Sequence, residues 1–538
     1  MMETEFDYVI VGAGSAGATL AARLSEDENI SVCLIEAGPS HKHFSVSTPG
    51  LLLLNMVTKK RNWGFETVPQ KGLNGRKGYQ PRGKMLGGSS GSNAMIYIRG
   101  NKSDYDHWAE LGNKGWSYEE VLPFFKKSEH FEGGESKFHG TGGPLNVTHK
   151  KEASPLNQTF IEAAQSLQIP LRKDFNSERQ EGVGLFDVTQ KRGKRWSAAN
   201  AYLDPVVDRN NLTIVTDCLA ERIILKGKQA TGVQIRTKSG QKTLLARREV
   251  IVSAGTFGSS HLLLLSGIGP PEKLLPHGIE TQHDLPGVGE NLHDHVDWVA
   301  NYKGKRSLHK ETIGFSLPGT FNMIGEILKY RKDGTGIFSS NIAESGAFLY
   351  LDRDEPAPDI QLHFIISIVD DHGRKLHWGH GFSVHVCLLR PKSRGSVSLA
   401  SSNPSDAPLI DPAFLEDERD MEKLYQGARL TQRLLQSAAF DDIRGKPIYG
   451  TEEEDEDRLR EDIRNRADTI YHPVGTCKMG TDKLAVVDAR LRVHGLKGLR
   501  VIDASIMPQV ISGNTNAPTI MIGEKGAQMI KEDWPEGV

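Results

Sequence analysis

Residues 8–17 read Tyr-Val-Ile-Val-Gly-Ala-Gly-Ser-Ala-Gly, and they decide the fold of the first part of the chain. The residues before the first glycine are mostly β-branched, which predicts a buried strand, and the Ala- and Leu-rich pattern through Leu24 predicts a helix. A second strand is predicted over residues 30–35 and ends at Glu36. Strand, glycine-rich turn, helix and acid in this order are typical of an α/β dinucleotide-binding domain.

The three glycines and the acid each have a physical role in such a domain. Gly12 makes the tight turn, Gly14 lets the backbone approach a pyrophosphate, and Gly17 lets the helix pack closely. Glu36 would accept a hydrogen bond from a ribose hydroxyl, so FAD or NAD is favoured over NADP. An ordinary turn is the alternative, and the correct spacing of strand, helix and acid disfavours it.

Length and charge exclude several classes of protein. A chain of 538 residues exceeds one compact core, so two or more structural units are expected. Lysine and arginine number 66 against 68 acidic residues, a formal charge of -2, which gives no basic field for nucleic acid. No apolar run approaches the roughly 20 residues of a membrane-spanning helix. These features favour a globular enzyme.

The cysteines and the N-terminus predict a compartment. Cys33, Cys218, Cys387 and Cys477 are widely spaced, which is typical of neither a disulfide framework nor a zinc site. The first residues are acidic and lack the basic flank and apolar stretch of a secretory signal. We therefore expect a cytoplasmic protein whose mature chain starts at this N-terminus.

A second glycine-rich segment, residues 82–94, reads Arg-Gly-Lys-Met-Leu-Gly-Gly-Ser-Ser-Gly-Ser-Asn-Ala. Its consecutive small residues predict backbone packed against a flat or anionic group. The alternative is a flexible linker, which the flanking apolar residues disfavour.

Five segments together carry a resemblance to a known family. Residues 82–94 and 255–269 resemble the two signature motifs of the glucose–methanol–choline (GMC) family of FAD oxidoreductases, and residues 471–476, Tyr-His-Pro-Val-Gly-Thr, resemble its catalytic histidine segment. Residues 501–505 and 513–519 resemble its C-terminal motifs, so the similarity covers the whole chain. It implies a discontinuous, Rossmann-like FAD-binding domain and a substrate domain of antiparallel sheet and helices.

The spread of these motifs along the chain predicts the domain boundaries. The FAD-binding domain would comprise residues 1–154, 205–300 and 466–538, and the substrate domain residues 155–204 and 301–465. Strands of the substrate sheet are expected over residues 360–368, 382–389 and 396–399. The acidic run at residues 452–457 is expected to be a solvated helix start, with a docking patch as the alternative.

The resemblance implies which residues bind FAD. The ADP half would be held by the first glycine turn and second strand, the pyrophosphate and isoalloxazine by residues 82–96, and the ribityl side by the C-terminal motifs. The implied contacts are Gly12, Gly14, Ser15, Gly17, Glu36, Ala37, Arg82, Met85, Gly87, Gly88, Ser89, Asn93, Ala94, Met95, Ile96, Ala220, Asp503, Ala504, Asn516 and Thr519. Ser92 stands where related enzymes with a covalently linked flavin have histidine, so we expect non-covalent FAD.

Alcohol oxidation needs a base that removes the hydroxyl proton while hydride passes to flavin N5. Histidine suits this role because it is largely neutral near pH 7. The resemblance implies His472 as the base and Asn514 as the second catalytic residue, which would orient the substrate oxygen but cannot relay a proton.

A metal-dependent reaction is the alternative reading of the histidines. His293, Asp294 and His295 could be drawn as ligands, but neighbouring histidines also fit an ordinary packed loop, and the family uses no metal for catalysis. We expect no metal site.

The sequence constrains the identity of the substrate less than that of the cofactor. Residues 191–197, 340–346 and 389–395 look closest to bacterial alkane-pathway FAD alcohol dehydrogenases, which resemble choline dehydrogenases. This implies oxidation of a primary, aliphatic alcohol to an aldehyde, with electrons passed to a quinone-type acceptor. Choline dehydrogenase, an oxygen-using alcohol oxidase, a flavin-containing lyase or decarboxylase, and a redox-inactive FAD protein remain as alternatives.

Two stretches suggest contact with a membrane surface. Residues 51–54 are four leucines that precede Lys59, Lys60 and Arg61, and residues 323–332 mix apolar residues with basic ones. Peripheral association with the inner membrane is the hypothesis, and a channel gate or core segment is the alternative for each stretch.

Overall fold

A seven-stranded sheet forms the centre of the first lobe of the computed structural model, which describes residues 4–150, 152–305, 308–450 and 455–535. Its strand order is β11 (Leu212–Val215), β2 (Val32–Ile35), β1 (Glu5–Val11), β14 (Gly240–Val252), β13 (Gln229–Thr237) and β12 (Leu219–Lys226), with β23 (Leu499–Val501) beside β14. The strands from β11 to β14, and β23, are parallel, while β12, β13 and β14 form an antiparallel meander. The buried, β-branched composition of β1 and β2 suits a parallel sheet covered on both faces.

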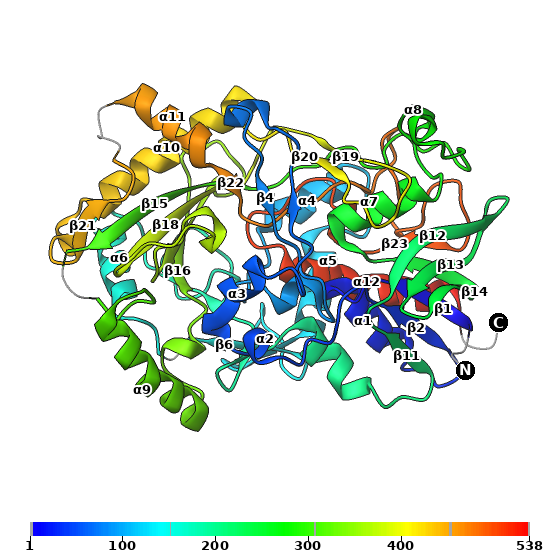
Figure 1. Cartoon of the computed structure of the whole chain (residues 1–538), viewed down its shortest axis with the longest axis horizontal. Helices are drawn as coiled ribbons and strands as arrows, with labels where there is room; N and C mark the ends of the chain where they lie inside the picture. The colour runs from blue at the N-terminus through cyan, green and yellow to red at the C-terminus, as the bar shows by residue number, and fades with distance from the viewer. Residues whose placement is uncertain (1–3, 151, 306–307, 451–454, 536–538) are drawn as a thin grey trace.

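The two ends of the chain meet on this lobe (Figure 1). Helix α12 (Asn516–Asp533) packs along α1 (Ser15–Leu24), so closely that a Cβ on Gly523 would lie 3.0 Å from the Ala16 carbonyl oxygen. Arg23 on α1 donates to the buried Glu524 carboxylate on α12 at 2.8 to 3.0 Å. The N-terminus of α12 is thereby fixed beside the first glycine turn.

A second seven-stranded sheet, which is antiparallel, forms the other lobe. Its strand order is β21 (Arg444–Pro447), β15 (Val296–Gly304), β18 (Gly381–Leu388), β17 (Ile360–Ile365), β16 (Ala343–Leu349) and β7 (Gly182–Leu185), with β22 (Asp468–Thr469) beside β15. Helices α10 (Glu418–Leu435), α11 (Glu456–Arg466) and α6 (Leu156–Ser166) lie on its outer side, and α9 (Leu317–Asp333) projects at the edge of the molecule (Figure 1).

The remaining elements are shorter and surround these two sheets. The other α-helices are α2 (Phe44–Ser47), α3 (Leu52–Val57), α4 (Lys102–Glu110), α5 (Tyr118–Ser128), α7 (Gly255–Leu265) and α8 (Pro271–Leu274). The other strands are β3 (Phe65–Glu66), β4 (Tyr79–Gln80), β5 (Glu129–Phe131), β6 (Leu145–His149), β8 (Asp187–Val188), β9 (Gln190–Lys191), β10 (Lys194–Arg195), β19 (Ser396–Ser398) and β20 (Leu409–Asp411). Among the described residues, no helix is both long enough and apolar enough to cross a membrane.

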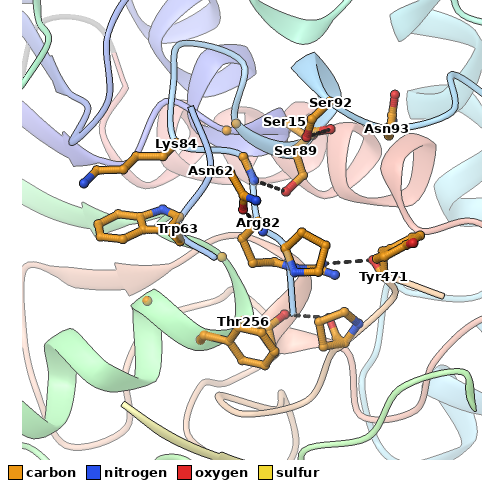
Figure 2. A pocket seen from close by; sticks show the side chains of 18 of the residues that line it. Ser15, Asn62, Trp63, Arg82, Lys84, Ser89, Ser92, Asn93, Thr256 and Tyr471 are labelled. Atoms are coloured by element: carbon orange, nitrogen blue, oxygen red, sulfur yellow. Dashed lines mark hydrogen bonds between the residues drawn. The ribbon is translucent and has the colours of Figure 1, made fainter. Parts of the chain in front are cut away.

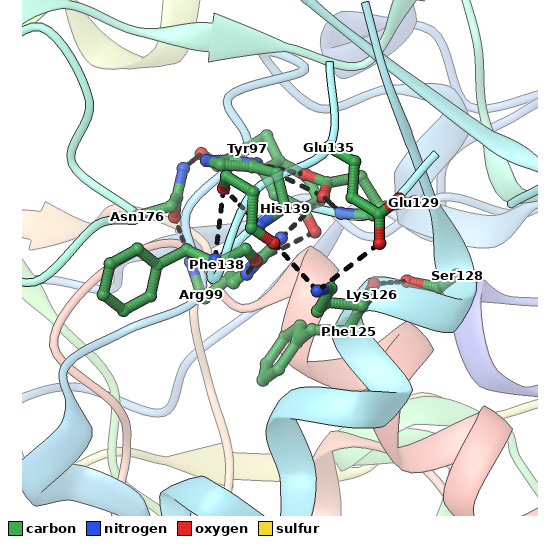
Figure 3. A network of polar contacts seen from close by, with 12 residues as sticks. Tyr97, Arg99, Phe125, Lys126, Ser128, Glu129, Glu135, Phe138, His139 and Asn176 are labelled. Atoms are coloured by element: carbon green, nitrogen blue, oxygen red, sulfur yellow. Dashed lines mark hydrogen bonds and ion pairs between the residues drawn. The ribbon is translucent and has the colours of Figure 1, made fainter. Parts of the chain in front are cut away.

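A buried polar network joins segments of both predicted domains (Figure 3). The Arg99 guanidinium is 2.7 Å from the Glu129 carboxylate, and the His139 ring lies between Glu129 and Asp174, at 3.0 and 3.1 Å. Burial opposes the charge on His139, but its hydrogen bonds to Asp174 and Glu129 outweigh burial and raise its pKa to about 9. The Asp174 loop is thus fastened to the α5–β5 segment by charge as well as by packing.

The fold class predicted from the sequence is confirmed, with one strand misplaced. Strands β17 and β18 occur where two strands of the substrate sheet were predicted. The prediction that residues 396–399 belong to that sheet is wrong: within the part of the chain that the structure describes, β19 pairs with β20 alone and packs on α7. Its Val397 joins a small separate cluster with Phe257, Leu292 and Ile410.

The domain boundaries stay predictions. Strand β15 begins at Val296, inside the segment assigned to the first domain, and joins the second sheet. Helix α11 starts at Glu456 with the Asp455 side chain capping it, in agreement with the expected helix start. Residues 452–454 of the acidic run lie outside the described residues.

Candidate active site

A cavity of about 540 Å³ lies where the two lobes and the C-terminal motifs meet, and Figure 2 shows part of its wall. It extends from the end of β1 and β2, past the segment of residues 82–96, to the face of the second sheet. A volume of this size is typical of a cofactor or substrate site.

The first glycine turn has the geometry that its sequence predicts. Gly12 has φ +97°, and a Cβ there would lie 2.5 Å from the Ser253 carbonyl oxygen. A Cβ on Gly17 would lie only 1.9 Å from the Gly12 carbonyl oxygen, so Gly17 serves close packing within the turn. A Cβ on Gly14 would instead meet no protein atom within 4 Å, because Gly14 borders the cavity.

Glu36 closes this end of the cavity. Its carboxylate accepts hydrogen bonds from the backbone N–H groups of Ala13 at 3.1 Å and Gly38 at 2.8 Å. Burial raises the pKa of Glu36 to about 7, against the effect of these two bonds. A carboxylate held in this way has acceptor capacity left for a ligand hydroxyl.

Two helix N-termini make this region suited to an anionic group. Helices α1 and α12 begin without a side-chain cap, and the Ser15 hydroxyl on α1 donates to the Asn516 amide oxygen on α12 at 2.8 Å. Uncapped N–H groups and the helix dipole attract negative charge. Elsewhere in the cavity wall, beside the Tyr471 carbonyl, Arg82 Nε and Nη2 are shielded from solvent without a hydrogen-bond partner, and burial lowers the pKa of Arg82 to about 10. The residues present therefore fit a ligand with a pyrophosphate.

Most of the predicted site residues line this one cavity. Those that do so are Gly12, Gly14, Ser15, Glu36, Ala37, Arg82, Gly88, Ser89, Asn93, Ala94, Met95, Ile96, Ala220, Asp503, Ala504, Asn516 and Thr519, together with His472 and Asn514.

Three predicted contacts lie behind the wall instead. Gly17 packs against Gly12, Gly87 donates its N–H to the Ala13 carbonyl at 2.7 Å, and the Met85 side chain is fully buried beside Gly91. They shape the two glycine-rich segments because their small or flexible side chains allow close packing, and they do not face the cavity.

A strained loop presents His472. Tyr471 has φ +76°, a conformation that an aromatic residue adopts only at a cost of about 1–3 kcal/mol. Arg82 Nη1 donates to the Tyr471 carbonyl at 2.9 Å (Figure 2). Asp294 accepts from the His472 backbone N–H at 2.9 Å. Thr256 Oγ1 donates to the Pro473 carbonyl at 2.7 Å. These bonds hold the loop in place against its strain.

The contacts of His295 and His472 assign their tautomers. His295 Nε2 lies 3.1 Å from the Leu389 carbonyl oxygen, which can only accept, so His295 is protonated at Nε2 and bare at Nδ1. His472 Nδ1 lies 3.1 Å from His295 Nδ1 and must therefore donate to it. Burial lowers the pKa of His295 to about 3 and that of His472 well below its ordinary value, helped at His472 by His295. His472 is then neutral, with its lone pair on Nε2.

Asn514 completes this arrangement. Its Nδ2 lies 3.2 Å from His472 Nε2, and its Oδ1 accepts from Gln361 Nε2 at 3.2 Å. Because Gln361 donates to the oxygen, the amide nitrogen of Asn514 is the atom that faces His472. The cavity therefore presents a hydrogen-bond acceptor, His472 Nε2, beside a donor, Asn514 Nδ2.

Two further histidines face the same space from the second sheet. His363 on β17 and His385 on β18 are register partners, and both line the cavity. Both ring nitrogens of His363, and Nε2 of His385, are buried without a hydrogen-bond partner, while His385 Nδ1 contacts the Asp297 carboxylate. Burial lowers the pKa of His363 to about 3.

The suspected metal ligands have other partners. His293 Nδ1 donates to the Asn291 carbonyl at 2.7 Å, and its Nε2 accepts from the Val510 N–H at 2.9 Å. Within the ranges that the structure describes, no three His, Cys, Asp or Glu side chains are arranged to hold a metal ion.

Comparisons with known proteins fit this geometry. The sequence matches the N-terminal domain of the GMC oxidoreductases over residues 6–297 and their C-terminal domain over residues 391–523. The chain belongs to the GMC oxidoreductases. Membership confirms the family, the oxidoreductase class and the FAD cofactor that the motifs implied.

Several GMC relatives align over almost the whole chain. The chain is 43% identical to an "Alcohol dehydrogenase [acceptor]" of Pseudomonas putida, covering 98% of this chain and 95% of that protein. It is 42% identical to an "Oxygen-dependent choline dehydrogenase" of Brucella anthropi, with the same coverage. The crystal structure of pyridoxine 4-oxidase from "Mesorbium loti" superposes with a TM-score of 0.89 at 32% identity, covering 98% and 99% of the two chains.

Sequence reasoning missed the side chains that the second sheet contributes. The sequence motifs assign no role to His363, His385 or Gln361. The alternation of Gln361, His363 and Ile365 along one predicted strand was the available signal, since such residues share one face of a sheet.

Proposed function

We propose that this GMC oxidoreductase oxidises a primary, aliphatic alcohol to an aldehyde, with FAD bound non-covalently and a quinone-type electron acceptor. The single observation that carries the proposal is the pair of His472 Nε2 and Asn514 Nδ2, 3.2 Å apart in the wall of the cavity. An unprotonated imidazole beside an amide donor is the arrangement that removes a hydroxyl proton and holds the oxygen.

His472 acts as the base, Asn514 orients the substrate oxygen, and His295 is a positioning residue. His295 fixes the tautomer because its bare Nδ1 requires the proton of His472 to reside on Nδ1. When His472 Nε2 takes the hydroxyl proton, the imidazolium keeps its hydrogen bond to His295.

FAD, when bound, supplies the acceptor for the hydride that leaves the alcohol carbon. The ADP half would be held by Gly14, Glu36 and the N-terminus of α1, and the isoalloxazine by the segment of residues 82–96. Ser92 in that segment lines the cavity and has no nucleophilic imidazole to offer, which supports a non-covalent flavin.

The apolar end of the cavity supports an aliphatic substrate. Leu52, Leu53 and Met56 of α3 line it together with Ile365 and Val369 of the second lobe. Burying a methylene group against such a wall gains about 0.8 kcal/mol, so each carbon of an alkyl chain would add affinity.

Choline is the second candidate, supported by the identity to choline dehydrogenases. A quaternary ammonium needs an aromatic or acidic partner. Asp297 lies on the same sheet face, but its carboxylate binds His385, so the aromatic side chains of Trp63, Phe65 and Tyr471 that line the cavity would be the partners of the ammonium group.

The decisive experiment is anaerobic mixing of the holoenzyme with straight-chain primary alcohols and with choline, followed by flavin absorbance. Bleaching by the aliphatic alcohols, with aldehyde as the product, is the expected result. A flavin that stays yellow with every alcohol would support a lyase or a redox-inactive protein instead. Faster re-oxidation by a quinone analogue than by oxygen, with little peroxide release, would distinguish a dehydrogenase from an oxidase.

We also propose a cytoplasmic enzyme that contacts the inner membrane peripherally. All four cysteines are buried thiols, which supports a reducing compartment. A membrane contact would bring the enzyme to a lipid-dissolved quinone.

A further inference from the structure

Helix α9 turns its polar side toward the protein. Asn322, Glu326 and Tyr330 follow one another at intervals of four residues and so share one face. Asn322 Nδ2 donates to the His309 carbonyl at 3.3 Å, and Glu326 Oε2 accepts from the Ile337 N–H at 2.8 Å. The Tyr330 ring packs on Phe338 at 6.3 Å between centroids. Polar contacts therefore attach this helix to the second lobe.

The opposite side of α9 is apolar and faces away from the protein. Leu317, Ile324 and Leu328 lie on it, at seven- and four-residue intervals, with 71%, 60% and 62% of their surface exposed. An ordinary surface helix has the reverse orientation, with its apolar stripe on the core. In Figure 1 this helix lies at the margin of the molecule, where nothing described covers its outer side.

Neighbouring loops extend the apolar surface. Phe315 forms bridges with Trp378 and Gly379, so the exposed side chains of Trp378 and Leu376 lie next to the start of α9. Leu54 and Val57 of α3 are also exposed, and α3 contacts the short helical turn at Asp371–Gly373 that precedes Leu376. We call the outer face of α9 with Phe315, Leu376, Trp378, Leu54 and Val57 the apolar face.

The apolar face has basic residues around it. Exposed cations lie on α9 or within a few residues of the apolar side chains: Lys59, Lys60, Lys310, Arg331, Lys332 and Lys375. In a dimer through this face, two such basic borders would be brought together, whereas the headgroups of anionic lipids would neutralise them.

We propose that the apolar face docks on an anionic lipid bilayer, with α9 lying in the interface. Apolar side chains bordered by lysine and arginine are the composition of helices that lie in a membrane surface. This docking rests on the proposed function, since it assigns the membrane contact of that enzyme to a defined surface.

The position of α3 links this surface to the cavity. Leu52, Leu53 and Met56 line the cavity, while Leu54 and Val57 of the same helix belong to the apolar face. A bilayer on the apolar face would thus lie one helix away from the apolar end of the cavity. An aliphatic alcohol and a quinone both partition into lipid, so this proximity serves the proposed reaction.

The test is co-sedimentation of the FAD-bound protein with vesicles of phosphatidylcholine alone or of phosphatidylcholine mixed with phosphatidylglycerol. We expect binding to the anionic vesicles only, weakened by salt. The variant Leu317→Gln/Ile324→Gln/Leu328→Gln should lower the bound fraction roughly tenfold. The control Val207→Gln/Leu245→Gln/Leu275→Gln replaces three other exposed apolar residues, which lie on the first lobe, and should bind as the wild type does.

Flavin absorbance and thermal unfolding establish that each variant is folded. A second variant, Arg331→Glu/Lys332→Glu, should bind less and lose much of the salt dependence. Equal binding by the wild type and both α9 variants, or no binding to anionic vesicles, would overturn the proposal. If the wild type does not bind vesicles but forms a dimer, and Leu317→Gln/Ile324→Gln/Leu328→Gln is a monomer, the apolar face binds a second copy of the chain instead. Because no substrate is present, failure of alcohol oxidation does not affect the result.

Discussion

The network around Arg99 and the cavity wall around Arg82 use the same residue types in opposite ways. Arg99 and His139 both contact the Glu129 carboxylate (Figure 3). His139 also contacts Asp174, and the pKa values of both cations are raised. Arg82 has two guanidinium nitrogens without a partner, and its pKa is lowered to about 10 (Figure 2).

His139 and His472 differ in the same way as the two arginines: the first has charged partners in the protein and the second does not. His139 contacts two carboxylates, while His472 contacts another neutral imidazole and an amide. The difference teaches that burial alone does not mark a functional site. A buried group whose partners are all protein atoms stabilises the fold, and a group with a missing or neutral partner is available to a ligand.

The largest expected effect is the loss of FAD binding on substitution of Gly14. Gly14→Val should abolish FAD binding while the apoprotein still folds, because its Cβ points into the cavity and meets no protein atom. Gly17→Val places a side chain 1.9 Å from the Gly12 carbonyl oxygen and should destabilise the apoprotein itself. Flavin absorbance and thermal unfolding of both proteins separate the two effects. Full FAD occupancy in Gly14→Val would contradict the nucleotide assignment.

The two histidines should separate catalysis from stability. His472→Ala should slow anaerobic flavin reduction by at least about a hundredfold with FAD still bound, since loss of a general base costs 10²–10⁴. His139→Ala should leave the reduction rate close to that of the wild type and lower the midpoint of urea unfolding. Stopped-flow absorbance measures the first quantity and urea titration the second. Equal rates in His472→Ala and the wild type would remove the proposed base.

The two arginines sharpen the same contrast in stability. Arg99→Met leaves Glu129 buried and short of its partner, which should cost about 3–5 kcal/mol of unfolding free energy. Arg82→Met removes one hydrogen bond to the Tyr471 carbonyl and should cost about 1 kcal/mol in the apoprotein, with a larger loss of FAD affinity. Urea denaturation of the two apoproteins gives both values. A similar cost for both would show that Arg82 is an ordinary structural arginine.

His295 tests whether the tautomer matters. His295→Phe removes the acceptor for His472 Nδ1–H, and flavin reduction should slow by roughly tenfold. His295→Asn can keep an acceptor near this position and should recover part of the rate. A displaced acid limb in the pH profile of His295→Phe would identify a change at His472. An unchanged profile and rate would remove the positioning role.

The two regions should also respond to pH in opposite directions. The raised pKa of His139 stabilises the fold fully below its ordinary value of 6.5, and this contribution is lost as pH rises through about 9. The lowered pKa of His472 keeps the base active down to below pH 6.5, and activity falls only at lower pH. Unfolding free energy and the rate of flavin reduction, each measured across pH, check the two signs. An acid limb of reduction near or above pH 6.5 would contradict the assignment at His472.

The predicted nucleotide end of the cavity has local signals in the sequence. The Gly12 turn and Glu36 lie within one strand–helix–strand unit, so spacing alone determines their geometry. The predicted contacts also include Met85 and Gly87, which do not line the cavity, because a motif does not tell a lining residue from a supporting one; Gly17 packs closely against Gly12, the role that its place in the motif predicts.

The sequence did not predict which face of the second sheet lines the cavity beside His472 and Asn514, because long-range strand pairing brings its residues together. His363 and His385 are far apart in the chain and become neighbours only through the register of β17 and β18. The tautomer of His472 likewise depends on Leu389 and His295, which no local pattern connects to residue 472. Strand β19 was misplaced for the same reason, since the short alternating run Ser-Val-Ser-Leu does not reveal which sheet it joins.

The most direct test of the central claim is single-turnover flavin reduction by a straight-chain primary alcohol without oxygen, in wild type and His472→Ala at equal FAD content. The account predicts rapid bleaching with aldehyde formation in the wild type and at least about a hundredfold slower bleaching in the variant. Equal bleaching in both proteins, or none in the wild type, would contradict it.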